Sequence, residues 1–242
     1  MSVHTTFKTG GAADVFVEPS NLAELKEVLR LLKGESFYLI GNGSNLLVSD
    51  KGIRGVVLHL AKGFGDIRVE GNTIVCGAAA TLSQIARAAL DNSLRGFEFA
   101  AGIPGSLGGA IVMNAGAYGG EMKQVVKRVT LLNYEGGIVQ KDVEEMHFSY
   151  RHSLLKEERF IVLEAEIELP KGVQSEIRER MDDLAARRRE KQPLEFPSAG
   201  STFKRPEGYF AAKLIQDAGL KGFCVGGAQV SEKHCGFVVN RG

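Results

Sequence analysis

A glycine-rich segment between residues 102 and 120 constrains the fold of this chain more than any other part of its sequence. Seven glycines fall within these nineteen residues, in the order Gly-Ile-Pro-Gly-Ser-Leu-Gly-Gly and, further on, Asn-Ala-Gly-Ala-Tyr-Gly-Gly. Glycine lets main-chain N–H groups turn toward an anion and approach it closely, so a pyrophosphate can be bound without lysine or arginine. Tight turns between packed elements also need glycine, so this loop alone does not show whether the segment binds an anion or only forms turns.

A second loop of the same kind favours the anion-binding interpretation. Residues 36–40 are largely apolar and aromatic, as expected of a strand, and residues 41–45 follow with the sequence Gly-Asn-Gly-Ser-Asn. Two such loops suit a dinucleotide with a pyrophosphate bridge. Neither loop matches the phosphate-binding loop of nucleotide hydrolases or the Rossmann fingerprint, which favours a flavin site of another type.

The overall composition excludes several other classes of protein. Thirty Lys and Arg residues against 29 Asp and Glu leave a formal charge of +1, so we expect neither nucleic acid nor a membrane as a partner. Three cysteines without a C-x-x-C pair argue against a disulfide framework and favour the reducing cytoplasm. Met1 to His4 lack the features of a signal peptide, and no apolar run approaches the ~18 residues of a membrane span. The histidines show no ligand spacing, so we expect no metal.

Local signals predict several helices. Asn21 and Glu24 form a capping-box pattern ahead of leucines and valine at helical spacing, which predicts a helix over residues 21–33. Thr81 and Gln84 form a second capping-box pattern before another amphipathic helix. A long charged helix is expected from about residue 173 to 190.

Strands are expected between these helices, and they predict the fold class. Gly71-Asn72 separates two short segments and predicts a two-residue hairpin of residues 67–70 and 73–76. Further strands are expected at residues 46–48, 126–134 and 160–169, and a loop-rich stretch is bracketed by Pro193, Pro197 and Pro206. This irregular alternation predicts a mixed α+β protein with two or three small lobes.

Six blocks of the sequence resemble one known family and follow the order of that family. The blocks are residues 4–11, 41–48, 102–109 with 114–119, 148–153, 197–206 and 226–231. Each block alone is weakly specific, but together they cover essentially the whole chain. The chain is therefore similar to the UDP-N-acetylenolpyruvoylglucosamine reductase family, in the type that lacks an extra substrate-binding tyrosine loop.

The resemblance implies a fold and a cofactor. The fold would be α+β, with a two-lobed FAD-binding domain of the vanillyl-alcohol-oxidase/PCMH type and a smaller α+β substrate-binding domain. Residues 1–60 would form the first lobe, residues 61–193 the second lobe with its long helix, and residues 194–242 the substrate-binding domain. The residues implied to bind noncovalent FAD are Gly41, Asn42, Gly43, Ser44, Asn45, Gly102, Ile103, Pro104, Gly105, Ser106, Gly108, Gly109, Asn114, Ala115 and Gly116.

The resemblance also implies a reaction, in which hydride from NADPH passes by way of FAD to the enolpyruvyl group of UDP-N-acetylglucosamine enolpyruvate. The product would be UDP-N-acetylmuramate, a cell-wall precursor. Hydride arriving at the β-carbon pushes negative charge toward the carboxylate, which calls for a fixed positive charge there and an acid at the α-carbon. Arg151 and Ser201 match these two catalytic roles in the family. Arginine grips a carboxylate with two parallel hydrogen bonds, and a neutral serine hydroxyl can protonate a strongly basic carbon.

Four further residues are implied to bind the substrate: Arg187, Lys191, Lys204 and His234. Residue patterns alone would give other interpretations. Arg151 would be an ion-paired residue of a surface turn, and Ser201 a turn or helix-cap serine. The basic cluster at 187–191 would be a solvated helix end, where cations complement the helix dipole. The catalytic and binding roles therefore come from the resemblance.

Two alternative functions stay open at this point. Another FAD oxidoreductase on the same scaffold, such as a small-molecule oxidase, would keep both glycine-rich loops. A flavin- or nucleotide-sugar-binding protein without turnover would keep the basic cluster.

The family pattern continues beyond Gly242 with a helix and a final strand, and this stretch carries a catalytic glutamate in the family. Glu195 and Glu232 belong to other blocks and are not matched to that glutamate. We therefore expect this 242-residue form to keep its pockets in outline with reduced turnover. We also expect a monomer.

Overall fold

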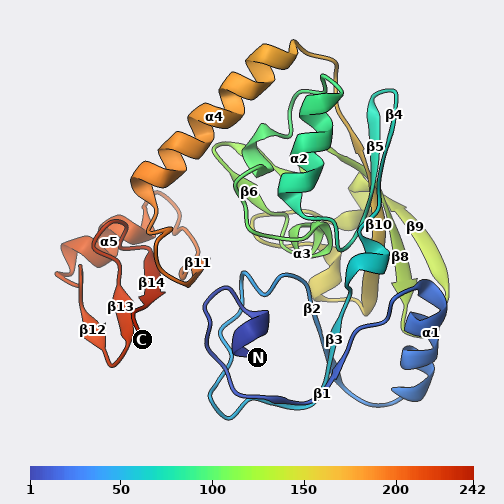
Figure 1. Cartoon of the computed structure of the whole chain (residues 1–242), viewed down its shortest axis with the longest axis horizontal. Coiled ribbons are helices and arrows are strands. Elements are labelled where there is room, and N and C mark those ends of the chain that lie inside the picture. Colours follow the sequence, from blue (N-terminus) through green and yellow to red (C-terminus); the bar gives the residue numbers. More distant parts are fainter. The chain divides into compact units, whose positions relative to one another are not determined.

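The computed structural model describes residues 1–242, except for the side chain of Lys62 (Figure 1). The helices are α1 (Leu22–Leu31), α2 (Leu82–Asp91), α3 (Leu107–Val112), α4 (Gln174–Lys191) and α5 (Ala211–Asp217). The strands are β1 (Ala13–Val17), β2 (Phe37–Ile40), β3 (Ile53–His59), β4 (Ile67–Glu70), β5 (Thr73–Gly77), β6 (Gly116–Ala117), β7 (Gly120–Glu121), β8 (Val126–Asn133), β9 (Ile138–Asp142), β10 (Phe160–Glu168), β11 (Ser198–Ser201), β12 (Cys224–Val225), β13 (Ala228–Val230) and β14 (Phe237–Asn240). The mixed α+β class predicted from the sequence is confirmed.

The chain forms two compact units, each assembled from segments that lie far apart in the sequence. Unit 1 consists of residues 1–14, 42–54 and 186–242, and unit 2 consists of residues 15–41 and 55–185. The first glycine-rich loop therefore begins in unit 2, at Gly41, and continues in unit 1.

A five-stranded antiparallel sheet forms the centre of unit 2, in the order β4-β5-β10-β8-β9. Helices α2 and α3 lie beside this sheet (Figure 1) and bury their apolar side chains against it. The fully buried residues of this core include Ile74, Cys76, Leu82, Ile85, Val129, Leu131, Ile161 and Ala165. Burial of each Val, Leu or Ile side chain in this core stabilises the fold by about 1.5–3 kcal/mol and holds the helices against the sheet.

Most of the helices and strands that local sequence signals predicted are present in the structure. The Asn21 side chain accepts a hydrogen bond from the Glu24 N–H at 3.0 Å, and Thr81 and Gln84 form a reciprocal capping box at the start of α2. Gly71 turns the β4–β5 hairpin with φ +64°. The predicted strands at 126–134 and 160–169 are β8 and β10, and the predicted charged helix is α4.

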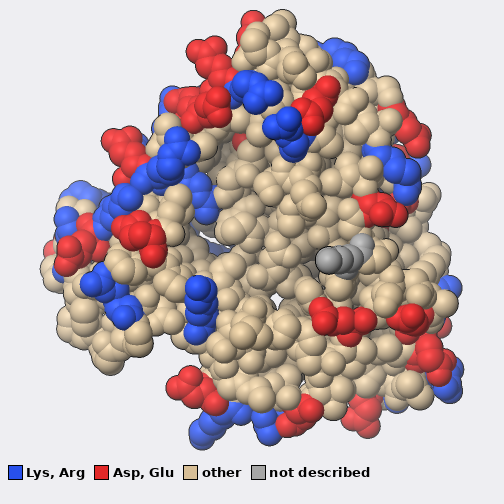
Figure 2. Space-filling model, in the orientation of Figure 1, with Lys and Arg blue, Asp and Glu red and all other residues tan. Residues whose placement is uncertain are grey.

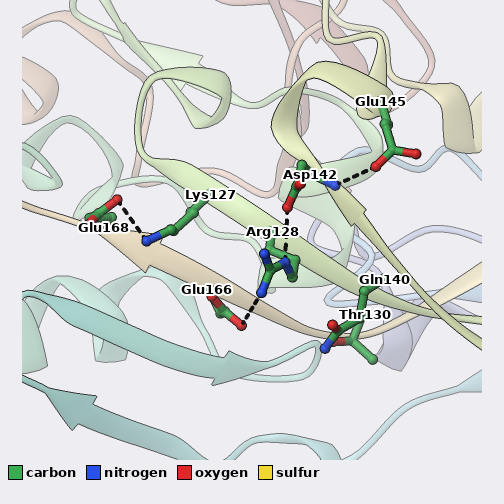
Figure 3. Close-up of polar contacts among 8 residues, drawn as sticks. All are labelled: Lys127, Arg128, Thr130, Gln140, Asp142, Glu145, Glu166 and Glu168. Atoms are coloured by element: carbon green, nitrogen blue, oxygen red, sulfur yellow. Dashed lines mark hydrogen bonds and ion pairs between the residues drawn. The ribbon is translucent and has the colours of Figure 1, made fainter.

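A row of polar side chains crosses strands β9, β8 and β10 (Figure 3). Arg128 of β8 lies opposite Asp142 of β9 and Glu166 of β10, with its guanidinium 2.9 Å and 3.8 Å from their carboxylates. The hydrogen bond that Arg128 donates to the Asp142 carboxylate raises the pKa of the guanidinium above its ordinary value. These partly exposed pairs agree with the register of the three neighbouring strands and add little to the stability of the fold.

A small sheet in the order β1-β3-β2 carries α1, whose Leu25 and Leu29 are buried in the same core as Leu58. Strands β2 and β3 are parallel.

The predicted strand at residues 46–48 is wrong. Leu47 is 73% exposed, and Val48 lies over Gly10 where a Cβ atom would clash. The following carbonyl, that of Ser49, accepts from Gly11 and Gly52 at 2.9 Å and 2.8 Å. This segment is therefore fixed by N-terminal loop contacts and not by a strand partner.

The four-stranded sheet of unit 1 has the order β11-β14-β13-β12. The N-terminal segment is tied to it, because Thr6 Oγ1 donates to the Ser198 carbonyl at 2.7 Å and Asn240 Nδ2 donates to the Phe7 carbonyl at 3.1 Å. Strand β11 lies within the stretch between Pro193 and Pro206 that the sequence indicated as loop-rich. Its partner is β14, some 36 residues away, so local sequence does not reveal the pairing.

The capping box of α2 gives a prediction for stability. We expect Thr81→Ala to lower the free energy of unfolding by about 1 kcal/mol, because the Gln84 N–H loses its acceptor. Thr81→Ser keeps the hydroxyl and should stay within a few tenths of a kcal/mol of the parent. Urea unfolding of the three proteins measures this difference, and equal midpoints for Thr81→Ala and the parent would contradict it.

Candidate active site

Three main-chain hydrogen bonds fix the second glycine-rich loop to the segment that follows β5. Leu82 N–H donates to the Gly105 carbonyl at 3.0 Å, and Leu107 and Gly108 N–H donate to the carbonyls of Ala80 and Ala78 at 2.8 Å each. A Cβ atom on Gly108 would lie 3.3 Å from Ala78, which is closer than ordinary contact. The N-terminus of α3 is therefore held tightly against the end of β5.

Gly41 and Ser106 meet where β2 ends and α3 begins. A Cβ atom on Gly41 would lie 2.3 Å from Ser106 Oγ, so any larger residue there would force this hydroxyl to turn away. Ser106 is 3% exposed, and no residue that the structure describes forms a hydrogen bond with its side chain. Its hydroxyl can still bond to a ligand or to water, both as a donor and as an acceptor. This position therefore fits a polar ligand group.

The two loops differ in which main-chain donors they leave unused. Within the described part of the chain, the N–H groups of Asn42, Gly43, Ser44 and Asn45 have no acceptor. The same holds for Gly102, Ser106 and Gly109 in the second loop. The implied cofactor residues whose N–H groups donate within the protein are Ile103, Gly105, Gly108, Asn114 and Ala115. Each loop thus offers a small set of uncharged donors, which is the chemistry that a pyrophosphate requires.

Gly43 is required by the packing of unit 1. Its φ is +60°, and a Cβ atom there would overlap the carbonyl oxygen of His4. The Gly43 carbonyl also accepts from the Thr6 N–H at 3.2 Å. The first loop is thereby fixed to the N-terminal segment.

Arg151 lies at the tip of a tight turn in unit 2. Ser149 and His152 exchange two main-chain hydrogen bonds of 3.1 Å, and Arg151 between them has φ +56°, an uncommon conformation for a side chain other than glycine. Its Nη2 donates to the Gly116 carbonyl at 3.0 Å, and its guanidinium lies 5.0 Å from the Tyr150 ring. No carboxylate among the described residues pairs with Arg151, so its charge is available beside the second loop.

The other implied catalytic residue, Ser201, ends β11 in unit 1. The Thr202 N–H donates to the Gly236 carbonyl at 2.8 Å and fixes the main chain at this point, while the Ser201 side chain is exposed.

The implied substrate-binding residues also belong to unit 1. Arg187 and Lys191 lie on the last turns of α4, and Lys204 is exposed after β11. His234 Nδ1 accepts from the Gly236 N–H at 3.2 Å, and its ring meets Phe237 edge-on at 5.1 Å. Burial lowers the pKa of His234 below its ordinary value, so the ring is neutral at pH 7.

Two residues that the sequence reasoning left out take part in this geometry. Glu121 binds the side chain of Asn114 at 2.9 Å, and Ser153 donates to the Val112 carbonyl at 2.9 Å while fully buried. The Glu121-x-x-Gln124 spacing is a capping-box pattern that could have drawn attention to Glu121. Nothing in the local sequence marks Ser153.

The surface charge, the possible metal ligands and the helices of the described residues each bear on a different kind of site. Acidic and basic side chains are interspersed over the face that Figure 2 shows, without a large area of one sign. In the described part of the chain, His, Cys, Asp and Glu residues form no cluster of three or more that could hold a metal ion. No described helix combines the length and apolar character that crossing a membrane requires.

The fold and the loops define a class of protein. Residues 13–141 match the family described as FAD binding domain. The structure of berberine bridge enzyme from Eschscholzia californica shares the fold, with a TM-score of 0.52 and 16% identity over 72% of this chain and 38% of that enzyme. The chain is thus an α+β protein whose two-lobed FAD-binding domain is of the vanillyl-alcohol-oxidase/PCMH type, with a smaller α+β domain.

More similar relatives define the family. Residues 192–242 match the C-terminal domain of UDP-N-acetylenolpyruvoylglucosamine reductase. The chain is 56% identical over its whole length to the reductase of that name from Caldanaerobacter subterraneus subsp. tengcongensis, of which it spans 80%. The crystal structure of the reductase from Thermus caldophilus superposes with a TM-score of 0.88 at 36% identity, covering all of this chain and 86% of that one. The chain belongs to the UDP-N-acetylenolpyruvoylglucosamine reductase family, and it is a flavin-dependent oxidoreductase with FAD as cofactor and NADPH as reductant.

The contact between Gly41 and Ser106 gives a prediction for cofactor binding. We expect Gly41→Ala to be purified with less FAD than the parent, because the new methyl group forces the Ser106 hydroxyl out of its position. Ser106→Ala removes only the hydroxyl and should weaken FAD roughly 10- to 100-fold, as expected for one hydrogen bond to a charged group.

The double variant Gly41→Ala/Ser106→Ala is the matched control for this prediction. A Cβ on Gly41 lies 3.6 Å from the Ser106 Cβ, so the double variant relieves the clash and should recover FAD to the level of Ser106→Ala. Flavin content is read from the absorbance of the purified proteins. Full occupancy in Gly41→Ala would show that this loop does not hold the flavin.

Proposed function

We propose that this chain reduces the enolpyruvyl group of UDP-N-acetylglucosamine enolpyruvate, with Arg151 and Ser201 acting on the substrate. The reaction of the family is the NADPH-dependent, FAD-mediated formation of UDP-N-acetylmuramate, a step in peptidoglycan precursor synthesis. The observation that carries the proposal is Arg151, whose guanidinium has no carboxylate partner among the described residues and lies beside Gly116.

The residues that would hold FAD are those with unused donors. They are the N–H groups of residues 42–45, the N–H groups of Gly102, Ser106 and Gly109, and the Ser106 hydroxyl. These groups fit a pyrophosphate, because they donate hydrogen bonds without adding fixed charge. When bound, FAD supplies the hydride that NADPH provides.

Arg151 binds the carboxylate of the enolpyruvyl group in this proposal. Reduction at the β-carbon moves negative charge onto that carboxylate, and a guanidinium stabilises it most when it is already in place. One of the five N–H donors of Arg151 is used by the Gly116 carbonyl, which leaves the others for a paired contact.

Ser201 delivers the proton to the α-carbon. Its hydroxyl is exposed at the end of β11, and no described residue forms a hydrogen bond with it. The neighbouring hydrogen bond of Thr202 to Gly236 fixes the main chain from which this side chain projects.

The basic residues of unit 1 bind the nucleotide part of the substrate. Arg187 and Lys191 bind the diphosphate from the last turns of α4, and Lys204 and His234 contribute from the C-terminal segment. His234 acts as a neutral donor or acceptor, because burial lowers its pKa.

We further propose that the protein is a cytoplasmic monomer, and that residues 1–60, 61–193 and 194–242 are its functional divisions.

Separate measurement of the two half-reactions tests these roles. We expect Arg151→Lys to slow oxidation of the reduced enzyme by substrate roughly 10²–10³-fold, the scale of one lost transition-state donor. Ser201→Ala should slow the same step, since only that step places a proton on carbon. Reduction of the bound flavin by NADPH should stay at the parent rate in both variants.

Stopped-flow absorbance follows both half-reactions, and Lys191→Ala serves as a control that weakens substrate binding without touching the reacting atoms. Equal losses in the two half-reactions would assign Arg151 to the fold or to the nicotinamide. Unchanged oxidation by substrate in Ser201→Ala would remove Ser201 from the mechanism.

A further inference from the structure

Asn114 is a fully buried polar residue at the end of the second glycine-rich loop. It is 0% exposed and has φ +40°, in the left-handed region that asparagine tolerates better than most residues. Its Nδ2 donates to Glu121 Oε2 at 2.9 Å and to the Ser149 carbonyl at 3.1 Å. Its Oδ1 accepts from the Lys123 N–H at 3.0 Å.

These contacts leave Asn114 no donor for a cofactor. A side-chain amide has two N–H donors, and both are used within the protein. The main-chain N–H of Asn114 donates to the Ile111 carbonyl at 3.2 Å. The side chain therefore acts on other parts of unit 2 and not on a bound flavin.

The carboxylate of Glu121 fixes the orientation of this amide. Besides Asn114, it binds Lys123 Nζ at 2.9 Å and accepts from the N–H of Gln124 in a capping box. Because the Glu121 carboxylate is fixed by these contacts and can only accept hydrogen bonds, the Asn114 amide must turn its nitrogen toward it. The opposite amide orientation would place two oxygens together and leave the Lys123 N–H without an acceptor.

The turn that carries Arg151 is anchored to one stretch of chain at three alternate residues. The Ser149 carbonyl binds Asn114, the Arg151 guanidinium binds the Gly116 carbonyl at 3.0 Å, and Ser153 Oγ binds the Val112 carbonyl at 2.9 Å. Arg151 itself is in a strained main-chain conformation, which persists only where the surroundings over-determine it. The contact of Asn114 lies at the first residue of this turn.

We propose that Asn114 is a positioning residue for Arg151. Its amide fixes the 149–152 turn to the glycine-rich loop, so that the guanidinium points where the substrate carboxylate binds. This inference rests on the proposed role of Arg151 in binding that carboxylate. Loss of the amide lets the turn relax, and the guanidinium moves away while the loop itself stays pinned to the segment after β5.

Two substitutions of Asn114 test the proposal in the FAD-loaded enzyme. Asn114→Asp keeps the size but loses both donors and places a carboxylate against Glu121. Asn114→Gly removes the amide and still accommodates φ +40° without strain. We expect each to slow oxidation of the reduced enzyme by substrate about 10- to 100-fold and to raise KM for the enolpyruvyl substrate, as a small misplacement of a binding group does. FAD content and the rate of reduction by NADPH should stay within about twofold of the parent, because neither depends on Arg151.

A rescue and a control separate positioning from a general loss of structure. In the double variant Asn114→Asp/Glu121→Gln, the new amide at position 121 can donate to the new carboxylate at position 114. The contact is thus restored with donor and acceptor exchanged, and part of the lost rate should be recovered. Asn133→Asp changes an asparagine that accepts from the Gly137 N–H at 2.7 Å in the β8–β9 loop, and should leave both half-reactions unchanged.

Two results would overturn the proposal. Parent rates with substrate in both Asn114 variants would show that the amide does not set the Arg151 position. Equal losses in FAD content and in both half-reactions, without rescue by Glu121→Gln, would show that Asn114 only supports the fold. Arg151→Lys separates failure of the positioning role of Asn114 from failure of the proposed role of Arg151. If Arg151→Lys is slow and the Asn114 variants are unaffected, only the positioning role is rejected. If Arg151→Lys is also unaffected, both roles are rejected.

Discussion

The geometry of unit 2 depends on the main-chain hydrogen bonds that join the second glycine-rich loop to the segment after β5. Gly105, Leu107 and Gly108 use their carbonyl or N–H groups in these bonds, which bring α3 so close to Ala78 that a Cβ atom at position 108 would lie only 3.3 Å from it. Fixing these groups leaves the N–H groups of Gly102, Ser106 and Gly109 for a ligand. A rigid loop with a few unused donors is preorganised for a pyrophosphate, so binding needs little reordering of the protein.

The stretch from Val112 to Gly116 has two tasks. It continues the loop that would hold the flavin, and it also anchors the turn of Arg151 through Asn114, Gly116 and Val112. Strain at Arg151 of order 1–3 kcal/mol is offset by these contacts. The group that binds the substrate carboxylate is therefore placed by the same stretch of main chain that would place the hydride-donating cofactor, and such shared support is what a short transfer distance requires.

The parts of the fold that the sequence predicted have local causes. Caps at Asn21 and Thr81 and the Gly71-Asn72 turn act within a few residues, and they mark α1, α2 and the β4–β5 hairpin. The pairing of β11 with β14 joins Ser201 to Phe237 and has no local signal, while Val48 packs on Gly10 and residues 46–48 form no strand. The resemblance supplied the residue types of the site. It did not supply the unused donors or the Asn114 contacts, because these depend on residues such as Ser149 that lie 35 positions away.

The central claim is that this chain is an enolpyruvyl reductase, and an anaerobic titration of the NADPH-reduced holoprotein with UDP-N-acetylglucosamine enolpyruvate tests it most directly. Flavin absorbance reports the oxidation state, and the nucleotide-sugar product is identified by mass. We predict return of the oxidised flavin spectrum at one equivalent of substrate, with UDP-N-acetylmuramate as the product. Flavin that stays reduced in excess substrate, yet is oxidised on admission of oxygen, would contradict the claim and would indicate a flavoprotein with another substrate.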